Sequence, residues 1–580
     1  MVASAKGVRP RISREVALPE VGSTVSHLER VVTLEVTLYL AALLLGILLR
    51  FVLLDQRPLS AGEGALASEA YRIMMGQPPA TLHQGAFDAY GTALALLLFG
   101  GGDGAARVLP ALFGSALVAV PYFLRSTLGR RAALVAAYGM AVSPVLLFAS
   151  RDVGGGIVAS ALGLLLWATL APGLKGIDRG RAYGSALLLA ALVSSGVEGI
   201  TVLATLGVAA TLAHPRPPTL LASAGQALAS TVGRRAIVLV AAALLVIGTN
   251  FGSNPAGVQW VAVDGWVNWL KAFSLSVPRG NLLLLLVLYE LPVLLLGVAQ
   301  LLRTVVRREG VDSLLSLWVM LLLLSGMVQE GNTTTRLVLP LVPLYLLAAR
   351  FVADTLPLAA GRGRGWRWGV SSLAVAVPTA VAVVLLNRLS TSAADLPAVY
   401  LYGEASVVAA AALIVVFLLD GRARAALAWF AVAILSVVYL VHGAAFLNYR
   451  METLSREPLV GTQISPVLRD AATSEAYLAR YFRVSMTVDP QLREPLSWYL
   501  RGTDSILFSA EPTQGMSLAL LQGGAGKLEP GSDRMPGLYA PSISSRDLIW
   551  QEVWRWVVNR DGLVRANQRD IIVRAPAGNW

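Results

Sequence analysis

The sequence predicts a helical membrane protein that crosses the bilayer many times and ends in a small α/β region. Of its 580 residues, 56% are hydrophobic and only 14% are charged, whereas soluble domains carry about 25% charged residues. A chain of this composition lacks the polar surface that a water-soluble protein of its size needs. From about residue 448 the apolar runs shorten to strand length, which marks the start of the α/β region.

About thirteen apolar segments have the length and composition expected of membrane spans, given a hydrocarbon core of roughly 30 Å. The first covers residues 31–53. The others lie near 105–125, 131–149, 154–172, 183–197, 198–213, 236–250, 281–302, 313–329, 337–354, 370–387, 400–419 and 424–446. The segments at 183–197 and 198–213 are either a helical hairpin or one interrupted span.

The distribution of basic residues predicts the orientation. Residues 1–30 are polar and basic and have no apolar core, so we expect a cytoplasmic segment and not a removable signal peptide. Arginine and lysine concentrate in this segment and in every second loop, which the positive-inside rule assigns to the cytoplasm. The loop at 54–104 and the tail at 448–580 then face outward from the plasma membrane.

Composition also excludes several functions. The net charge of +12 lies mainly in the loops between spans, so it is a topology signal and does not indicate nucleic-acid binding. The chain has no cysteine, which excludes disulfides, thiolate metal sites and a cysteine nucleophile.

The loop at 54–104 is the predicted site of chemistry within the transmembrane domain of residues 31–447. Long loops in compact proteins are usually functional or disordered, and this one carries acids, aromatic residues and two apolar stretches typical of interfacial helices. Glu63 is the main candidate. The alternative is an ordinary carboxylate at a helix start, where the helix dipole favours it.

The run Ser150–Arg151–Asp152, followed by Gly154–Gly155–Gly156, is a second candidate. Arginine can bind phosphate, aspartate can bind a cation, and glycine permits close approach of a ligand. An interfacial ion pair beside a flexible turn explains the same residues equally well.

Three charged residues of the later spans complete the candidates. Glu290 lies roughly 13 Å into its span, where an ionisable residue suggests a functional site. Glu330 and Arg336 flank a polar outer loop, and Arg336 is placed to hold a lipid phosphate or to anchor the span at the interface. Tryptophans 260, 266 and 269 are typical of an interfacial aromatic belt.

In the tail, strands are expected at 459–464, 483–488, 506–509 and 571–573. Helices are expected at 465–481 and 546–558. Ser465 is a candidate N-cap for the first of these helices, with Pro466 at its first position. Alternation of strands and helices indicates a small α/β domain.

Five short motifs resemble the C-type membrane glycosyltransferases, known as the GT-C fold, and in particular the prokaryotic flippase-associated and protein-mannosyltransferase-like group. They are Ala106–Gly114, Leu128–Ala133, the pair Ser143–Pro144 and Ser150–Arg151, Glu457–Val460 and Glu494–Arg501. The resemblance implies an inverting transfer of a sugar from a polyprenyl-phosphate donor, within the membrane lipid, to a protein, lipid or glycan acceptor on the outer face.

The resemblance also implies roles for individual residues. Glu63 matches one member of an acidic pair and is the expected base. Gln84–Gly85–Ala86 stands where the family carries His-Gly-Pro, and Asp152 matches the acid after the third span. Asp152 is the candidate ligand for a divalent cation, Mg²⁺ or Mn²⁺, if the reaction uses one.

The remaining candidate residues are expected ligands of phosphate and substrate. Arg151, Arg336, Gln84 and Glu330 are expected to bind the lipid phosphate or the substrate. The companion acid is replaced by Gly62, which leaves open a second function, a catalytically degenerate scaffold or lipid-linked-sugar binding protein. A third function is a transporter, to which Glu290 points.

Overall fold

The computed structural model describes most of residues 34–574. The undescribed stretches inside this range are 80–81, 172–177, 215–216, 274–280, 308–309, 361–420, 451–454, 504–505, 510–517, 523–531, 544–552, 554–555, 558–559 and 561–562. Two predicted spans, at 370–387 and 400–419, lie outside the described residues.

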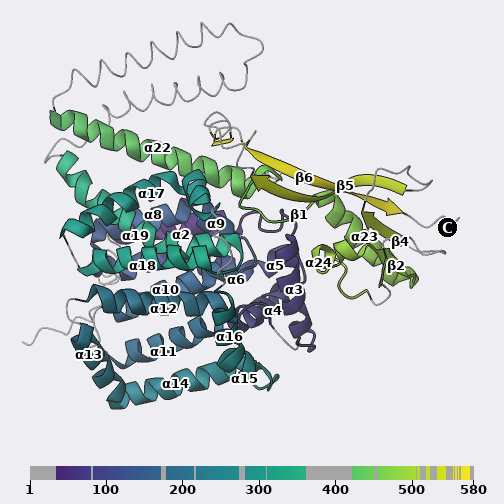
Figure 1. The fold of residues 1–580 in the computed structure, drawn as a ribbon, viewed down its shortest axis with the longest axis horizontal. Coiled ribbons are helices and arrows are strands. Elements are labelled where there is room, and N and C mark those ends of the chain that lie inside the picture. The colour runs from purple at the N-terminus through teal and green to yellow at the C-terminus, as the bar shows by residue number, and fades with distance from the viewer. Residues whose placement is uncertain are drawn as a thin grey trace, which may run out of the picture.

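A bundle of helices forms the larger part of the molecule (Figure 1). Its helices are α2 (Leu34–Phe51), α6 (Val108–Phe123), α7 (Arg125–Leu128), α8 (Arg130–Val142), α9 (Pro144–Ala149), α10 (Gly156–Leu170), α11 (Arg179–Ser194), α12 (Gly196–Ala213), α13 (Pro217–Ala229), α14 (Thr231–Gly248), α17 (Asn281–Arg307), α18 (Gly310–Val328), α19 (Thr333–Ala360) and α22 (Gly421–Tyr449). Seven of the described helices are long and apolar enough to cross a membrane: α2, α12, α14, α17, α18, α19 and α22. The multi-span helical class is confirmed, and the exact number of spans stays a prediction.

Helices α11 and α12 form a hairpin, which decides between the two readings of residues 183–213. They contact one another and turn at Ser195–Gly196. Gly196 adopts φ +73°, a left-handed conformation that glycine reaches without steric cost.

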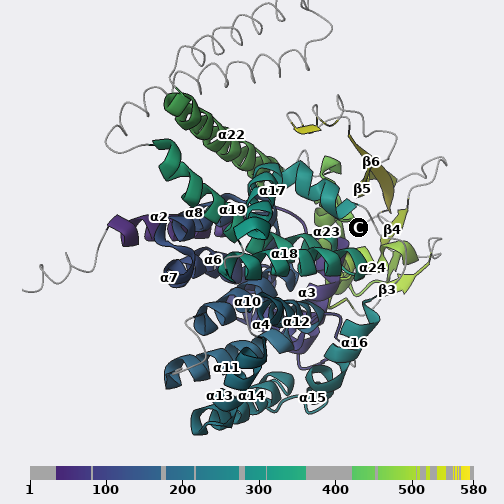
Figure 2. The same cartoon turned by 60° about the vertical axis from the view of Figure 1, so that its left-hand side comes forward.

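The first long loop folds into three helices at one end of the bundle: α3 (Ala61–Met74), α4 (Ala86–Phe99) and α5 (Asp103–Ala106). The same end carries α15 (Gly257–Gln259), the π-helical turn η1 (Trp260–Asp264) and α16 (Gly265–Lys271) (Figures 1 and 2). The loops that carry these elements, which the charge pattern assigns to one side of the membrane, thus lie at one end of the bundle.

Ser60 and Glu63 form a capping box that begins α3, because each side chain accepts from the other's backbone N–H.

The tail forms a mixed six-stranded sheet with the order β1-β5-β6-β4-β2-β3. Its elements are β1 (Gln463–Ile464), α23 (Pro466–Phe482), β2 (Met486–Val488), the 3₁₀ turn η3 (Pro490–Leu492), α24 (Arg493–Leu496), β3 (Ile506–Phe508), β4 (Leu518–Gln522), β5 (Ser532–Ile543) and β6 (Val564–Arg574). Strand β2 pairs in parallel with β3 and β4, and the other pairings are antiparallel.

The sequence predicted this region in part. Ser465 caps α23 and accepts from the Leu468 N–H at 2.9 Å, with Pro466 at the first helical position. Strand β5, the longest, was not predicted, because its Pro536–Gly537 step and its charged residues hide the strand pattern. Most of the helix expected at 546–558 lies outside the described residues.

The first loop and the tail share one hydrophobic core, separate from the core of the bundle. Leu59 and Ala67 pack there with Leu468 and Trp498. Asp103 joins the two parts further, because Trp498 Nε1 donates to its Oδ1 at 2.7 Å and the Tyr499 hydroxyl donates to its Oδ2 at 2.8 Å. The tail is therefore part of the structure that shapes the first loop.

Candidate functional site

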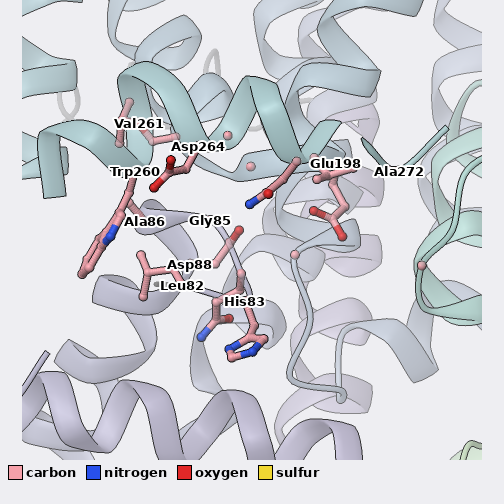
Figure 3. Close-up of a pocket in the computed structure, with 18 of the residues that line it drawn as sticks. Leu82, His83, Gly85, Ala86, Asp88, Glu198, Trp260, Val261, Asp264 and Ala272 are labelled. Atoms are coloured by element: carbon pink, nitrogen blue, oxygen red, sulfur yellow. The ribbon is translucent and has the colours of Figure 1, made fainter. Parts of the chain in front are cut away.

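A cavity of about 750 Å³ lies at the end of the bundle that carries the first loop. Its walls come from the segment before α4, the start of α12, the stretch from α15 to α16 and the turn before α19 (Figure 3). Its hydrogen-bonding side chains are those of His83, Gln84, Asp88, Ser194, Glu198, Gln259, Trp260, Asp264, Asn268, Lys271, Glu330, Asn332 and Thr335. A concave site with this many convergent polar groups suits a ligand rich in hydroxyl groups.

Two glycines permit the close packing behind this cavity. A Cβ on Gly85 would lie 2.3 Å from the carbonyl carbon of Ser195, so the segment before α4 rests directly on the turn between α11 and α12. A Cβ on Gly155 would lie 2.9 Å from Asp88 Oδ2 and 3.8 Å from Glu198 Oε2. The glycine run noted in the sequence therefore makes room for two carboxylates.

Asp88 is the most unusual side chain of the cavity. It is 3% exposed, and neither carboxylate oxygen has a hydrogen-bond partner among the described residues. Burial, with a smaller contribution from the neighbouring charge of Glu198, raises the pKa of Asp88 well above its usual range. Figure 3 shows the Asp88 and Glu198 carboxylates directed into the same space.

The charge of the cavity is predominantly negative. Four of its described lining residues carry carboxylates, namely Asp88, Glu198, Asp264 and Glu330. Lys271 is the one lysine or arginine among them. An anionic ligand entering this space therefore meets more negative than positive charge.

Glu63 lies outside the lining of the cavity, in a buried network with two arginines. Its carboxylate accepts from Arg107 Nε at 2.7 Å and Nη2 at 2.9 Å, and Arg57 Nη2 lies 3.3 Å from both oxygens. The backbone N–H groups of Ser60 and Val153 also donate to it. Burial alone opposes its charged form, but the ion pairs with Arg107 and Arg57 prevail and lower the pKa of Glu63 to about 2.

Asp152 borders the same network, with Oδ1 at 3.3 Å from Arg57 Nη2. Burial and the negative charge of Glu63 raise its pKa to about 7, despite the nearby arginines. Among the described residues, no group of three or more histidine, aspartate or glutamate side chains is arranged to hold a metal ion. A cation beside Asp152 would also face the guanidinium group of Arg57, so these surroundings do not fit the divalent cation expected there.

Arg151 is engaged with the end of α2. Its Nη1 donates to the carbonyls of Leu49, Arg50 and Val52, and its Nη2 donates to that of Leu53 at 2.7 Å. Two of these carbonyls belong to the last turn of α2, which lacks internal donors, and the other two directly follow the helix. The contacts of Arg151 are thus those of a helix cap.

The other predicted ligands divide between the cavity and its surroundings. Gln84 and Glu330 line the cavity. Arg336, on the first turns of α19, is half-buried and donates to the carbonyl of Gly326. Their roles toward a substrate stay predictions.

Glu290 is fully buried and has a complete set of partners. Its carboxylate accepts from the Ser143 hydroxyl, the Val145 N–H at 3.2 Å and the Tyr345 hydroxyl at 2.7 Å. It lies at a break in α17, where its own φ and ψ are not helical. These contacts explain Glu290 as a residue that joins a broken helix to its neighbours, so it no longer points to a transporter.

Sequence reasoning did not single out Asp88, and it took the Trp260 segment for an interfacial belt. Asp88 sits in an apolar helix, AFDAYGTALALLLF, where an isolated acid was the available signal. Trp260 is buried and lines the cavity, and Trp269 Nε1 donates to Thr201. The turn that carries these tryptophans is therefore part of the site.

Comparison with known proteins supports the fold. No family model matches the sequence, and no curated protein matches it. The structure is similar to ArnT from Cupriavidus metallidurans bound to undecaprenyl phosphate, with a TM-score of 0.57 and 17% identity over 94% of this chain and 99% of that one. For the apo state of ArnT the TM-score is 0.50, with 17% identity over 84% and 92%.

The likeness covers nearly the whole of both chains, including the tail. The narrower resemblance to the flippase-associated and mannosyltransferase-like group stays a prediction. The chain is a membrane protein with the GT-C fold that the short sequence motifs predicted.

Proposed function

We propose that this protein is a membrane glycosyltransferase that moves a sugar from a polyprenyl-phosphate donor to an acceptor on the outer face of the membrane. One observation carries the proposal. A cavity lined by thirteen hydrogen-bonding side chains lies at one end of a fold that is similar, over 94% of this chain, to a protein bound to undecaprenyl phosphate. In this proposal the sugar occupies the cavity, and Gln84 and Glu330 bind its hydroxyl groups.

Glu63 has two candidate roles in this function. As the base it would take the proton of the acceptor hydroxyl, which requires a carboxylate that is free to accept it. As an anchor it would hold Arg57 and Arg107 and so fix the first loop. The four donor groups on its carboxylate and its low pKa favour the anchor.

Transfer from a panel of polyprenyl-phosphate sugars by the purified protein in nanodiscs tests the proposal. Glu63→Gln is compared with the wild type and with Asp470→Asn, a matched change of an exposed acid on α23. Turnover by the wild type supports the proposal. A Glu63→Gln variant that keeps the melting temperature but loses turnover would make Glu63 the base, whereas loss of both would make it an anchor.

A degenerate binding protein is the second candidate. It is favoured by Gly62 and Gln84, which stand where the resemblance implies an acid and a histidine. Saturable binding of a polyprenyl-phosphate sugar with no turnover of any donor would support this candidate and reject the enzyme.

A further inference from the structure

Glu69 and His83 lie against one another where the first loop meets the cavity. Glu69 belongs to α3 and is buried, and the main-chain N–H of His83 donates to both of its carboxylate oxygens, at 3.1 and 3.3 Å. The Nδ1 atom of His83 lies 3.6 Å from Glu69 Oε2. One buried carboxylate therefore contacts both the backbone and the ring of His83.

The segment that carries His83 is held on both sides. Gln84 Nε2 donates to the Leu66 carbonyl on α3 at 3.3 Å, and Gly85 rests against the backbone of Ser195. His83 lines the cavity, and its side chain is 80% exposed (Figure 3). The imidazole is thus open to a solute that arrives from water, while the carboxylate behind it is shielded.

Two acids of this region are poorly suited to accept a proton. Glu63 lies outside the lining of the cavity, and its carboxylate is occupied by donors. Asp88 is buried, and burial favours its protonated form by raising its pKa. An imidazole side chain ordinarily gains and loses its proton near neutral pH, where general bases work best. His83 is the one histidine among the described residues that line the cavity.

We propose that His83 is the general base of the sugar transfer and that Glu69 is its positioning residue. The Nε2 atom of His83 takes the proton of the acceptor hydroxyl, and the acceptor oxygen bonds to the anomeric carbon of the sugar. The bond from that carbon to the phosphate oxygen breaks, and polyprenyl phosphate leaves with the bonding electrons. Glu69 accepts from Nδ1–H, which fixes the ring and its tautomer. This role rests on the proposed function.

The burial of Glu69 suits a positioning residue. Removal from water raises the pKa of its carboxyl group, while the contacts with His83 and the charge of Arg72 on the same helix oppose this rise. A buried carboxylate can compensate a positive charge that forms on the ring during the reaction. The separation of 3.6 Å exceeds a hydrogen bond, and catalytic hydrogen bonds often reach their full strength only when the substrate binds.

Turnover of polyprenyl-phosphate sugars by the full-length protein in nanodiscs tests the base. We expect His83→Ala to lower kcat by about 10²–10⁴-fold without lowering the melting temperature, because the side chain is exposed. Glu69→Gln should lower kcat by about 10–100-fold. Added imidazole should restore part of the turnover of His83→Ala and none of that of Glu69→Gln. His214→Ala, at the end of α12 away from the cavity, is the matched control and should turn over like the wild type.

The tautomer of the ring gives a readout that needs no turnover. Solid-state NMR of the protein labelled with ¹⁵N-histidine distinguishes the Nδ1–H form of a neutral imidazole from the Nε2–H form, and His83→Ala assigns the signal. We expect the Nδ1–H form in the wild type and a mixture of both forms in Glu69→Gln. An Nε2–H form in the wild type, or the same tautomer in both proteins, would overturn the pair. If Glu69→Gln does not fold, the tautomer of the wild type and the imidazole rescue of His83→Ala decide.

The outcomes separate this inference from the proposed function. Turnover by the wild type that His83→Ala retains would overturn the base and leave the glycosyltransferase in place. Loss of turnover in His83→Ala together with a lower melting temperature and no rescue by imidazole would also overturn it, since a structural role then explains the loss. No turnover of any donor by the wild type would reject the proposed function, and the base with it, even where the tautomer shows that the pair forms.

Discussion

At the residue scale, Glu63 and Asp152 show how neighbouring groups set the properties of a carboxylate. Both are buried next to Arg57, yet the pKa of Glu63 falls and that of Asp152 rises. Glu63 takes the short bonds from Arg107, and its negative charge then disfavours a second charge on Asp152. Residue type and position in the sequence do not distinguish these two acids. Only their contacts in the folded chain show that their pKa values shift in opposite directions.

Replacing Glu63 by glutamine should strongly destabilise the protein. The change leaves Arg57 and Arg107 buried with reduced compensation, and breaking a buried ion pair typically costs about 3–5 kcal/mol. The melting temperature in detergent measures the effect, with Asp470→Asn as the control at an exposed ion pair. A melting temperature equal to that of the wild type would contradict the anchoring role.

Asp152 should make stability depend on pH. Its pKa is raised from 3.8 to about 7 in the folded state, so folding is favoured by the bound proton below pH 3.8 and this contribution is lost as the pH rises to 7. Asp152→Asn imitates the protonated form, and its melting temperature relative to the wild type should therefore increase between pH 4.5 and 7.5. A constant difference across this range would show that Asp152 is charged throughout.

At the element scale, glycine contacts decide how helices meet around the cavity. Gly85 touches the turn between α11 and α12, and Gly196 supplies that turn's left-handed residue. Neither glycine is distinguishable from its neighbours in a glycine-rich chain. The need for them becomes visible only when two segments more than one hundred residues apart are in contact.

Gly85→Ala should disrupt this contact. Its Cβ would fall 2.3 Å from backbone of Ser195, which cannot move aside as a flexible side chain would. We expect a lower melting temperature and weaker ligand binding in the cavity. Gly62→Ala is the matched control, because nothing lies within 4 Å of its Cβ in α3 and alanine favours a helix by up to about 1 kcal/mol. Equal melting temperatures for the two variants would refute the close-packing explanation.

At the scale of the whole molecule, the tail and the first loop act as one unit. Their common core contains side chains from α3, α4, α23 and α24, and Asp103 bonds to Trp498 and Tyr499 across it. Helix α4, which presents Asp88 to the cavity, and the segment before it, which carries Gln84, therefore rest in part on the C-terminal sheet region. This arrangement makes the tail a structural support of the site.

Asp103→Ala should loosen this support. The indole N–H of Trp498 and the Tyr499 hydroxyl would lose buried acceptors, each at a cost of about 1–3 kcal/mol. Limited trypsin digestion should then cleave the tail faster than in the wild type. Trp498→Phe, which removes one of the two bonds to Asp103, should give an intermediate rate. Identical digestion of all three proteins would show that the shared apolar core suffices.

The sequence alone determined the structural class of the protein and the order of most of its helices along the chain. The length of the apolar segments predicts the spans, because a helix must be long enough to cover the hydrocarbon core. Most of the predicted spans within the described residues are helices. Ser465 and Pro466 mark the start of α23 because capping depends on local chemistry. Short motifs were enough to predict the GT-C fold.

The tertiary structure alone decided which acids share a site. Glu63 stood out in the sequence, but its distance from the cavity and its two arginine partners depend on contacts with residues up to 90 positions away. Asp88 and Glu198 were not linked by any spacing, since α4 and α12 come together only when the hairpin turn packs on Gly85. Local interactions fix helices, whereas burial and the meeting of distant charges, which set the chemistry of a carboxylate, exist only in the folded chain.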